Sequence, residues 1–205
     1  MIGALEVMVR LSHRTMPKAT FTLTTLLAAF LAASTPTAQV KQPVWQVCFT
    51  PGQDCTTLIV DEISGARASI LVQAYSFTSV PILSALKAAH ARGVDVEVIV
   101  DQTSAKVSKS GSHYSAATYL TNAGIPVWVD IHVSIAHNKV MVLDGATVIT
   151  GSFNFTAAAQ HHNAENLLVI RDPQLAAEYQ ANWESRRAVS VPYAGPGDFG
   201  PAAEE

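Results

Sequence analysis

The residues best suited to chemistry form two short groups in the second half of the chain. His137 and Lys139 are two positions apart, so on a β-strand both side chains leave the same face. An imidazole can attack phosphorus or transfer a proton, and a neighbouring ammonium can bind the non-bridging oxygens of a phosphodiester. Ser152 and Asn154 have the same spacing and add a hydroxyl and an amide for those oxygens, while Gly151 lets the backbone approach closely. The spacing therefore indicates phosphodiester chemistry.

A longer pattern unites these residues: H-x-K-x4-D-x6-G-S-x-N, with Asp144 at the aspartate position. This pattern resembles the signature of the phospholipase D superfamily. Segments between Val47 and Arg187 are similar to short, secreted bacterial endonucleases of that superfamily. The resemblance implies hydrolysis through a phosphohistidine, without a cofactor or a metal ion. It also implies that the Glu165 carboxylate hydrogen-bonds the catalytic histidine.

The reaction that the resemblance implies needs two histidines, because one attacks phosphorus while the other protonates the leaving oxygen. The chain contains one His-x-Lys motif of this kind, since His90, His113 and His132 have no lysine two positions later. The resemblance thus implies a homodimer in which His137 of one subunit meets His137 of the other across a two-fold axis.

Simpler interpretations stay open for some of these residues. Lys139 could be a solvated lysine on a strand, and Glu165 an exposed charge at the start of one. Asp144 precedes a glycine and could serve only as a turn former, so a structural role and a direct part in catalysis are both open. His161 and His162 are adjacent, so on a helix they point in different directions, and no carboxylate pair accompanies them. The sequence therefore predicts no metal site.

Composition and charge limit how the chain can hold a substrate. It has 205 residues, 49% hydrophobic and 14% charged, with a formal charge of −3. These values fit a folded domain and exclude disordered, collagen-like and disulfide-dense chains. An acidic balance argues against binding nucleic acid by bulk positive charge, so phosphate binding must be local. Lys106 and Lys109 lie in a polar stretch, where they could contact a nucleic-acid backbone or be merely solvated.

The first residues form a targeting segment. Three basic residues precede an apolar run from Phe21 to Ala33, and small, turn-forming residues follow it. This order is typical of a secretory signal peptide, predicted here over residues 1–38 with cleavage between 32 and 38. A retained membrane anchor is the alternative, but the run is shorter than the ~20 residues that span a bilayer. We therefore expect a periplasmic or secreted protein.

Export changes how the two cysteines are interpreted. Cys48 and Cys55 flank a Pro-Gly turn that could bring their side chains together. In an oxidising compartment a local disulfide is expected, and a pair of unlinked thiols is the alternative.

The rest of the chain alternates helical and strand-like segments, which indicates an α/β fold. A strand, a helix ended by Gly93 and a second strand form a βαβ unit with parallel strands. We predict one domain over residues 45–190, a mixed, largely parallel sheet with helices on both faces, and a flexible tail over 191–205. Strands are predicted over 68–76, 94–100, 126–130, 139–143, 147–150 and 167–171, and helices over 56–64, 80–92, 114–123 and 173–187.

Three functions fit these features. The first is a metal-independent, sequence-nonspecific endonuclease acting on DNA, with RNA left open, and with no stable membrane association after the signal peptide is removed. The second is a phospholipase D-type lipid phosphodiesterase that uses the same residues. Relatives that act on lipids tend to carry two motifs and apolar loops, whereas this chain has one motif and a polar stretch over 103–113. The third is a non-catalytic binding module, which the intact motif argues against. We expect the endonuclease.

Overall fold

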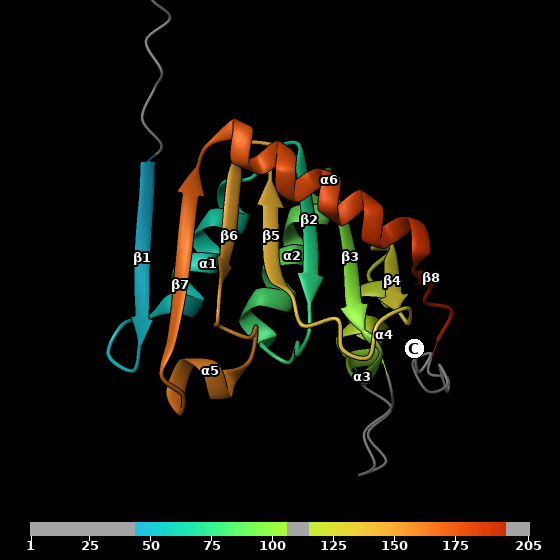
Figure 1. Ribbon diagram of the computed structural model, residues 1–205, viewed down its shortest axis with the longest axis horizontal. Helices are drawn as coiled ribbons and strands as arrows, with labels where there is room; N and C mark the ends of the chain where they lie inside the picture. The colour runs from blue at the N-terminus through green and yellow to red at the C-terminus, as the bar shows by residue number, and fades with distance from the viewer. Residues whose placement is uncertain (1–43, 106–114, 196–205) are drawn as a thin grey trace, which may run out of the picture. The chain divides into compact units, whose positions relative to one another are not determined.

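The computed structural model describes residues 44–105 and 115–195, shown in colour in Figure 1. The predicted signal peptide, the loop lysines Lys106 and Lys109, and the predicted tail from residue 196 lie outside the described residues.

The fold is built on one eight-stranded sheet with the strand order β1-β7-β6-β5-β2-β3-β4-β8. The sheet is mixed, as predicted, but it is not largely parallel: among its named strands only β2 with β3 and β3 with β4 pair in parallel. The difference arises because the β5–β6 hairpin and β7 follow one another antiparallel on one side of the βαβ unit. The strands are β1 (Val44–Thr50), β2 (Ser69–Ala74), β3 (Asp95–Asp101), β4 (Val127–Asp130), β5 (Lys139–Leu143), β6 (Thr147–Gly151), β7 (Glu165–Arg171) and β8 (Val191–Pro192).

Helices cover both faces of the sheet, as predicted (Figure 1). On one face lie α1 (Cys55–Gly65), α2 (Val80–Ala91) and α4 (Ala116–Asn122), and on the other lies α6 (Pro173–Val189). Two short helices, α3 (Gln102–Ala105) and α5 (Ala157–His161), lie at one end of the strands. No helix among the described residues is long and apolar enough to cross a membrane.

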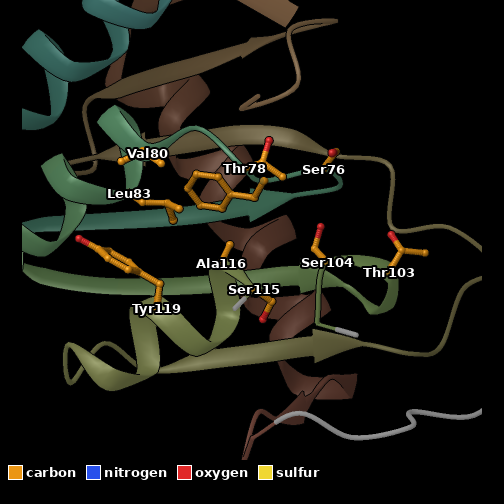
Figure 2. A pocket seen from close by; sticks show the side chains of 10 residues that line it. Ser76, Thr78, Val80, Leu83, Thr103, Ser104, Ser115, Ala116 and Tyr119 are labelled. Carbon is orange, nitrogen blue, oxygen red and sulfur yellow. The ribbon is translucent and has the colours of Figure 1, made fainter. Parts of the chain in front are cut away.

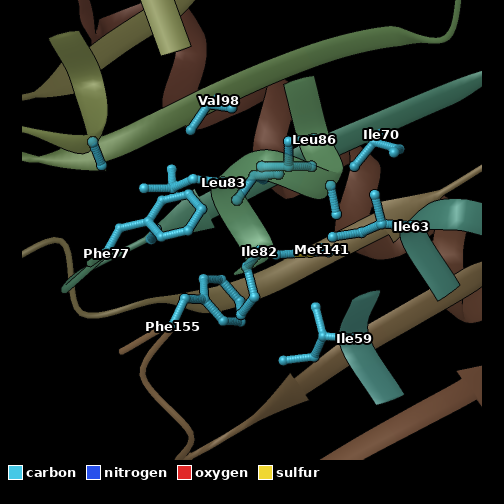
Figure 3. Close-up of a cluster of buried hydrophobic side chains, with 14 of the residues drawn as sticks. Ile59, Ile63, Ile70, Phe77, Ile82, Leu83, Leu86, Val98, Met141 and Phe155 are labelled. Carbon is cyan, nitrogen blue, oxygen red and sulfur yellow. The ribbon is translucent and has the colours of Figure 1, made fainter. Parts of the chain in front are cut away.

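Successive side chains along the strands point to opposite faces of the sheet, and the apolar ones form a hydrophobic layer on each face. The larger layer packs the inner sides of α1 and α2 against strand residues such as Ile70 and Met141 (Figure 3). The neighbouring residues Leu71 and Val140 point to the other face, under α6. There Trp183 donates its indole N–H to the Val72 carbonyl oxygen at 2.9 Å. Burial on both faces explains why these strands read as continuous apolar runs in the sequence.

The two outermost strands were not predicted. β1 pairs antiparallel with β7, and the predicted Cys48–Cys55 disulfide is confirmed where β1 leads into α1, with the two Cα atoms 5.7 Å apart. At the opposite edge β8 pairs with β4, and Tyr193 is only 6% exposed. The predicted tail boundary at residue 191 is therefore wrong, because residues 191 to 193 pack against the sheet.

Asp144 connects the β5–β6 turn to the start of β2. Its carboxylate accepts backbone N–H bonds from Arg67, Ala68 and Ser69 at 3.0, 2.7 and 3.0 Å. The residue has a positive φ of 53°, which the turn requires. It lies at the end of β5 opposite to Lys139, away from the His-x-Lys motif. This placement favours the structural role over a direct part in catalysis.

We predict that Asp144→Asn lowers the free energy of unfolding at neutral pH by about 1 kcal/mol, the net value of a typical intramolecular hydrogen bond. Burial raises the pKa of Asp144, but the N–H donors of Ala68, Ser69 and Arg67 outweigh burial and hold that pKa below its ordinary value. A carboxyl group whose pKa is lower in the folded than in the unfolded state stabilises the fold at pH values above its unfolded-state pKa. This stabilisation disappears as the pH falls through the folded-state pKa. Urea unfolding of both proteins across the acidic range measures the effect.

Asp61→Asn is the matched control, since Asp61 is exposed on α1 and its carboxylate makes no hydrogen bond with other described residues. Equal stability of the Asp144 and Asp61 variants at neutral pH would contradict the structural role.

Candidate active site

The two groups of motif residues meet at one end of the sheet. β2, β3 and β4 end there, and because β5 is antiparallel to β2, β5 begins there (Figure 1). β6 returns antiparallel to β5, so Gly151 at its end comes back to the level of Lys139. Glu165 begins β7 at the same end, beside β6. The topology thus gathers residues that are far apart in the sequence.

His137 lies just before β5 rather than on the strand, in contrast to the expectation from its spacing. Its ring is exposed and packs against the Tyr75 ring, with the centroids 4.6 Å apart and the planes at 61°. The Tyr75 N–H also donates to the Asn138 carbonyl oxygen at 2.8 Å. Tyr75 follows the last residue of β2, so the end of that strand positions the imidazole. Sequence reasoning missed Tyr75, although its place directly after a buried strand was a usable signal.

Lys139 is only 7% exposed, although it carries an ammonium group. Its Nζ donates to the His137 carbonyl oxygen at 2.9 Å and lies 5.0 Å from the Tyr75 ring centroid. Burial lowers the pKa of Lys139, while the negative charge of Glu165 opposes this effect. The solvated-lysine alternative does not fit this burial. The ammonium and the His137 imidazole thus both lie against the Tyr75 ring.

Ser152 and Glu165 form a connected polar group. The Ser152 hydroxyl donates to Glu165 Oε2 at 2.6 Å, and Asn163 Nδ2 donates to Glu165 Oε1 at 2.9 Å. Ser152 in turn accepts the Asn166 N–H at 3.0 Å. Both Glu165 oxygens are therefore engaged, and within the described structure the expected hydrogen bond from Glu165 to His137 is not formed. Glu165 acts on the site through its charge near Lys139.

Asn154 and Gly151 complete the motif. Asn154 Oδ1 is buried and has no hydrogen-bond partner among the described residues, so this amide keeps unused bonding capacity beside the site. Gly151 has a positive φ of 152°, and a Cβ there would collide with the Asn166 carbonyl oxygen. Close approach of the neighbouring strand, rather than of a ligand, therefore requires glycine at this position.

Two buried aspartates hold the segment that carries His137. Asp101, 1% exposed at the end of β3, accepts the Ala136 N–H at 2.8 Å. Asp130, 2% exposed at the end of β4, accepts the His132 N–H at 3.2 Å and pairs with Arg186 through bonds of 2.8 and 2.7 Å. The predicted strands 94–100 and 126–130 end next to Asp101 and at Asp130, but sequence reasoning assigned these residues no function, because partners such as Ala136 and Arg186 lie far along the chain. We interpret them as positioning residues for the segment before β5.

His161 and His162 lie at and just after the end of α5, are both exposed, and have ring centroids 6.3 Å apart. In the described ranges, no group of three or more histidine, cysteine or acidic side chains is arranged to hold a metal ion.

An exposed imidazole and a buried ammonium at the end of a mixed α/β sheet fit an enzyme that acts on phosphate esters. Residues 59–187 match a family model described as cardiolipin synthase, PLD-like domain. This match covers more than half of the 205 residues, so the chain belongs to the phospholipase D-like family. It is accordingly a hydrolase of phosphodiester bonds.

Known relatives agree with this assignment. The chain is 45% identical over 151 residues to a phospholipase D of Rickettsia bellii, covering 74% of this chain and 73% of the relative. Among solved structures, the phospholipase D family member Nuc from Salmonella typhimurium is 37% identical, with a TM-score of 0.66, over 74% of this chain and 99% of that one. NucT from Helicobacter pylori shares the fold at 24% identity, with a TM-score of 0.66, over 74% and 100% of the two chains.

We predict that the alkaline limb of the pH–activity profile follows Lys139. The protonated ammonium binds the phosphate, so kcat/KM falls as pH rises through the pKa of Lys139, which burial places below its ordinary value of 10.5. Glu165→Gln removes the charge that opposes this lowering, so the limb moves to still lower pH. Hydrolysis of bis(4-nitrophenyl) phosphate across the alkaline range measures the shift.

Glu178→Gln is the control, because Glu178 is exposed on α6 and forms no ion pair with other described residues. A limb that stays in place or moves upward in Glu165→Gln would contradict the electrostatic coupling.

Proposed function

We propose that the protein is a metal-independent, sequence-nonspecific endonuclease that hydrolyses DNA, with RNA left open as a substrate. The observation that carries the proposal is the pairing of exposed His137 with buried Lys139, 2.9 Å from Lys139 Nζ to the His137 carbonyl oxygen. An exposed nucleophile at an open strand end suits a long polymer that must lie across the site. Local rather than bulk positive charge suits an enzyme that contacts the backbone without selecting bases.

In the proposed mechanism an imidazole nitrogen of His137 attacks phosphorus and displaces one nucleoside oxygen, which a second histidine protonates. Water then attacks the phosphohistidine, gives its proton to the second histidine and releases His137. Lys139 and Asn154 bind the non-bridging oxygens and stabilise their charge in the transition state, with Ser152 assisting.

The second histidine comes from another copy of the chain. Each chain supplies one His-x-Lys motif, so a two-fold axis through the site brings two His137 side chains to one phosphate. The functional unit in this proposal is a homodimer with one composite site.

The proposed location is the periplasm or the cell exterior, after removal of residues 1–38. The Cys48–Cys55 disulfide supports it, because disulfides form and persist in oxidising compartments.

A lipid phosphodiesterase is the second candidate. The Rickettsia relatives are named phospholipase D, and a 32% identical protein of Drosophila melanogaster is named mitochondrial cardiolipin hydrolase. This chain spans about 56% of the Drosophila protein. Ile135, 55% exposed two residues before His137, is an apolar side chain that could meet a lipid surface.

The experiment offers plasmid DNA and phosphatidylcholine vesicles separately to the purified protein in excess EDTA. We expect DNA cleavage to persist, and His137→Ala to lower it by at least about 1,000-fold, as for removal of a catalytic nucleophile. His161→Ala is the matched control, since His161 is an exposed histidine outside the motif, and it keeps its activity.

Loss of DNA cleavage in EDTA would refute the metal-independent mechanism. Turnover of lipid without cleavage of DNA would establish the lipid phosphodiesterase instead.

A further inference from the structure

A cavity of about 570 Å³ opens beside the site, at the carboxyl ends of β2 and β3 (Figure 2). This volume lies within the range of about 300 to 1,000 Å³ that is typical of small-ligand sites. The described apolar part of its wall includes the aromatic ring of Tyr119 from α4 and consists of Phe77, Val80, Leu83, Ala116 and Tyr119. None of the described side chains that line it is charged.

Hydroxyl groups form the rest of the wall. Two of them already donate to protein acceptors: Ser104 to the Tyr75 carbonyl oxygen at 2.5 Å, and Thr103 to Asp101 Oδ1 at 2.6 Å. Each keeps lone pairs with which it can accept a further hydrogen bond. The hydroxyl-bearing residues are Ser76, Thr78, Thr103, Ser104 and Ser115.

Most of the apolar side chains and most of the hydroxyl-bearing side chains lie at opposite sides of the cavity. Figure 2 shows Ser76, Thr103 and Ser104 at one side and Val80, Leu83 and Tyr119 at the other. Thr78 and Ser115 lie between them, so hydroxyl groups continue toward the apolar side.

The hydroxyl side adjoins the catalytic residues. Ser76 directly follows Tyr75, whose ring packs 4.6 Å from the His137 ring. Lys139 is the buried ammonium beside His137, and none of the described side chains that line the cavity is a cation, so we place the phosphate charge at Lys139. A substrate bound at His137 therefore extends an uncharged part of itself into the cavity.

We infer that this cavity binds the nucleoside next to the scissile phosphate, with the sugar at the hydroxyl side and the base against Tyr119. The inference rests on the proposed nuclease function. The Thr78 hydroxyl makes no hydrogen bond with other described residues, so the edge of a base can bond to it, whereas an alkyl chain would cover it without a partner. Stacking on an aromatic ring accepts every base, so the cavity contributes affinity without sequence selection.

The test compares three small esters that release the same nitrophenolate: methyl, decyl and thymidine-5′ esters of 4-nitrophenyl phosphate. The variants are Tyr119→Leu, which removes the aromatic face, and Val80→Trp, which obstructs the cavity from a position 67% exposed and so does not disturb the core. The readout is the ratio of kcat/KM for the thymidine ester to that for the methyl ester. Using a ratio cancels any general loss of active protein.

We expect both variants to lower this ratio about tenfold, the effect of losing one stacked base. Val189→Trp, at an exposed position at the end of α6, is the control and leaves the ratio unchanged. An unchanged ratio in both cavity variants would overturn the inference, as would a fall only in the decyl-to-methyl ratio, which would assign the cavity to an alkyl chain.

The two proposals fail in different ways. If the unmodified protein does not cleave plasmid DNA in EDTA, the proposed function fails whatever the ester ratios are. If it cleaves DNA while the ratio is insensitive to both variants, only the nucleoside site fails.

Discussion

The antiparallel pairing of β5 with β2 is the constraint on which the site depends. Parallel strands β2, β3 and β4 all end at one edge of the sheet, and only an antiparallel neighbour can begin there. This geometry sets the His137 ring against Tyr75 and starts β5 at Lys139. The hairpin then returns Gly151 and the residues after it to the same edge, where β7 begins with Glu165. A β5 parallel to β2 would instead begin at the other end of the sheet, away from Tyr75.

Charge at the site is concentrated rather than spread over the surface. The chain is acidic overall, with a formal charge of −3, yet it buries Lys139 to 7% exposure next to His137, the proposed nucleophile. Burial lowers the pKa of that lysine, and the Glu165 charge limits how far it falls. A partly desolvated cation interacts more strongly with a phosphate than a solvated one, so few positive groups suffice. The buried Asp101 and Asp130 carboxylates serve a different purpose, since backbone N–H groups and Arg186 occupy them while they hold the segment before His137.

Local patterns predicted much of the fold and the motif itself. Apolar runs identified the six inner strands, and the spacing of His137, Lys139, Ser152 and Asn154 identified the chemistry. Edge strands β1 and β8 were not predicted, because their stability comes from pairing with β7 and β4, which are distant in the sequence. The roles of Tyr75, Asp101 and Asp130 were missed for a similar reason. Only the folded sheet brings them near their partners His137, Ala136 and Arg186. The expected Glu165 bond to His137 was replaced by bonds to Ser152 and Asn163, which only the side-chain packing reveals.

The central claim is that one chain holds half of an active site. A single His-x-Lys motif supplies one histidine, and the two-step reaction uses two. The most direct test is the burst of product at the first turnover, measured with alkali quenching, which preserves phosphohistidine, and with mass spectrometry to locate the phosphoryl group. We predict a burst of about half an equivalent per chain, with the phosphoryl group on His137, because two chains share one site. A full equivalent per chain, or no phosphoryl group on His137, would contradict the claim.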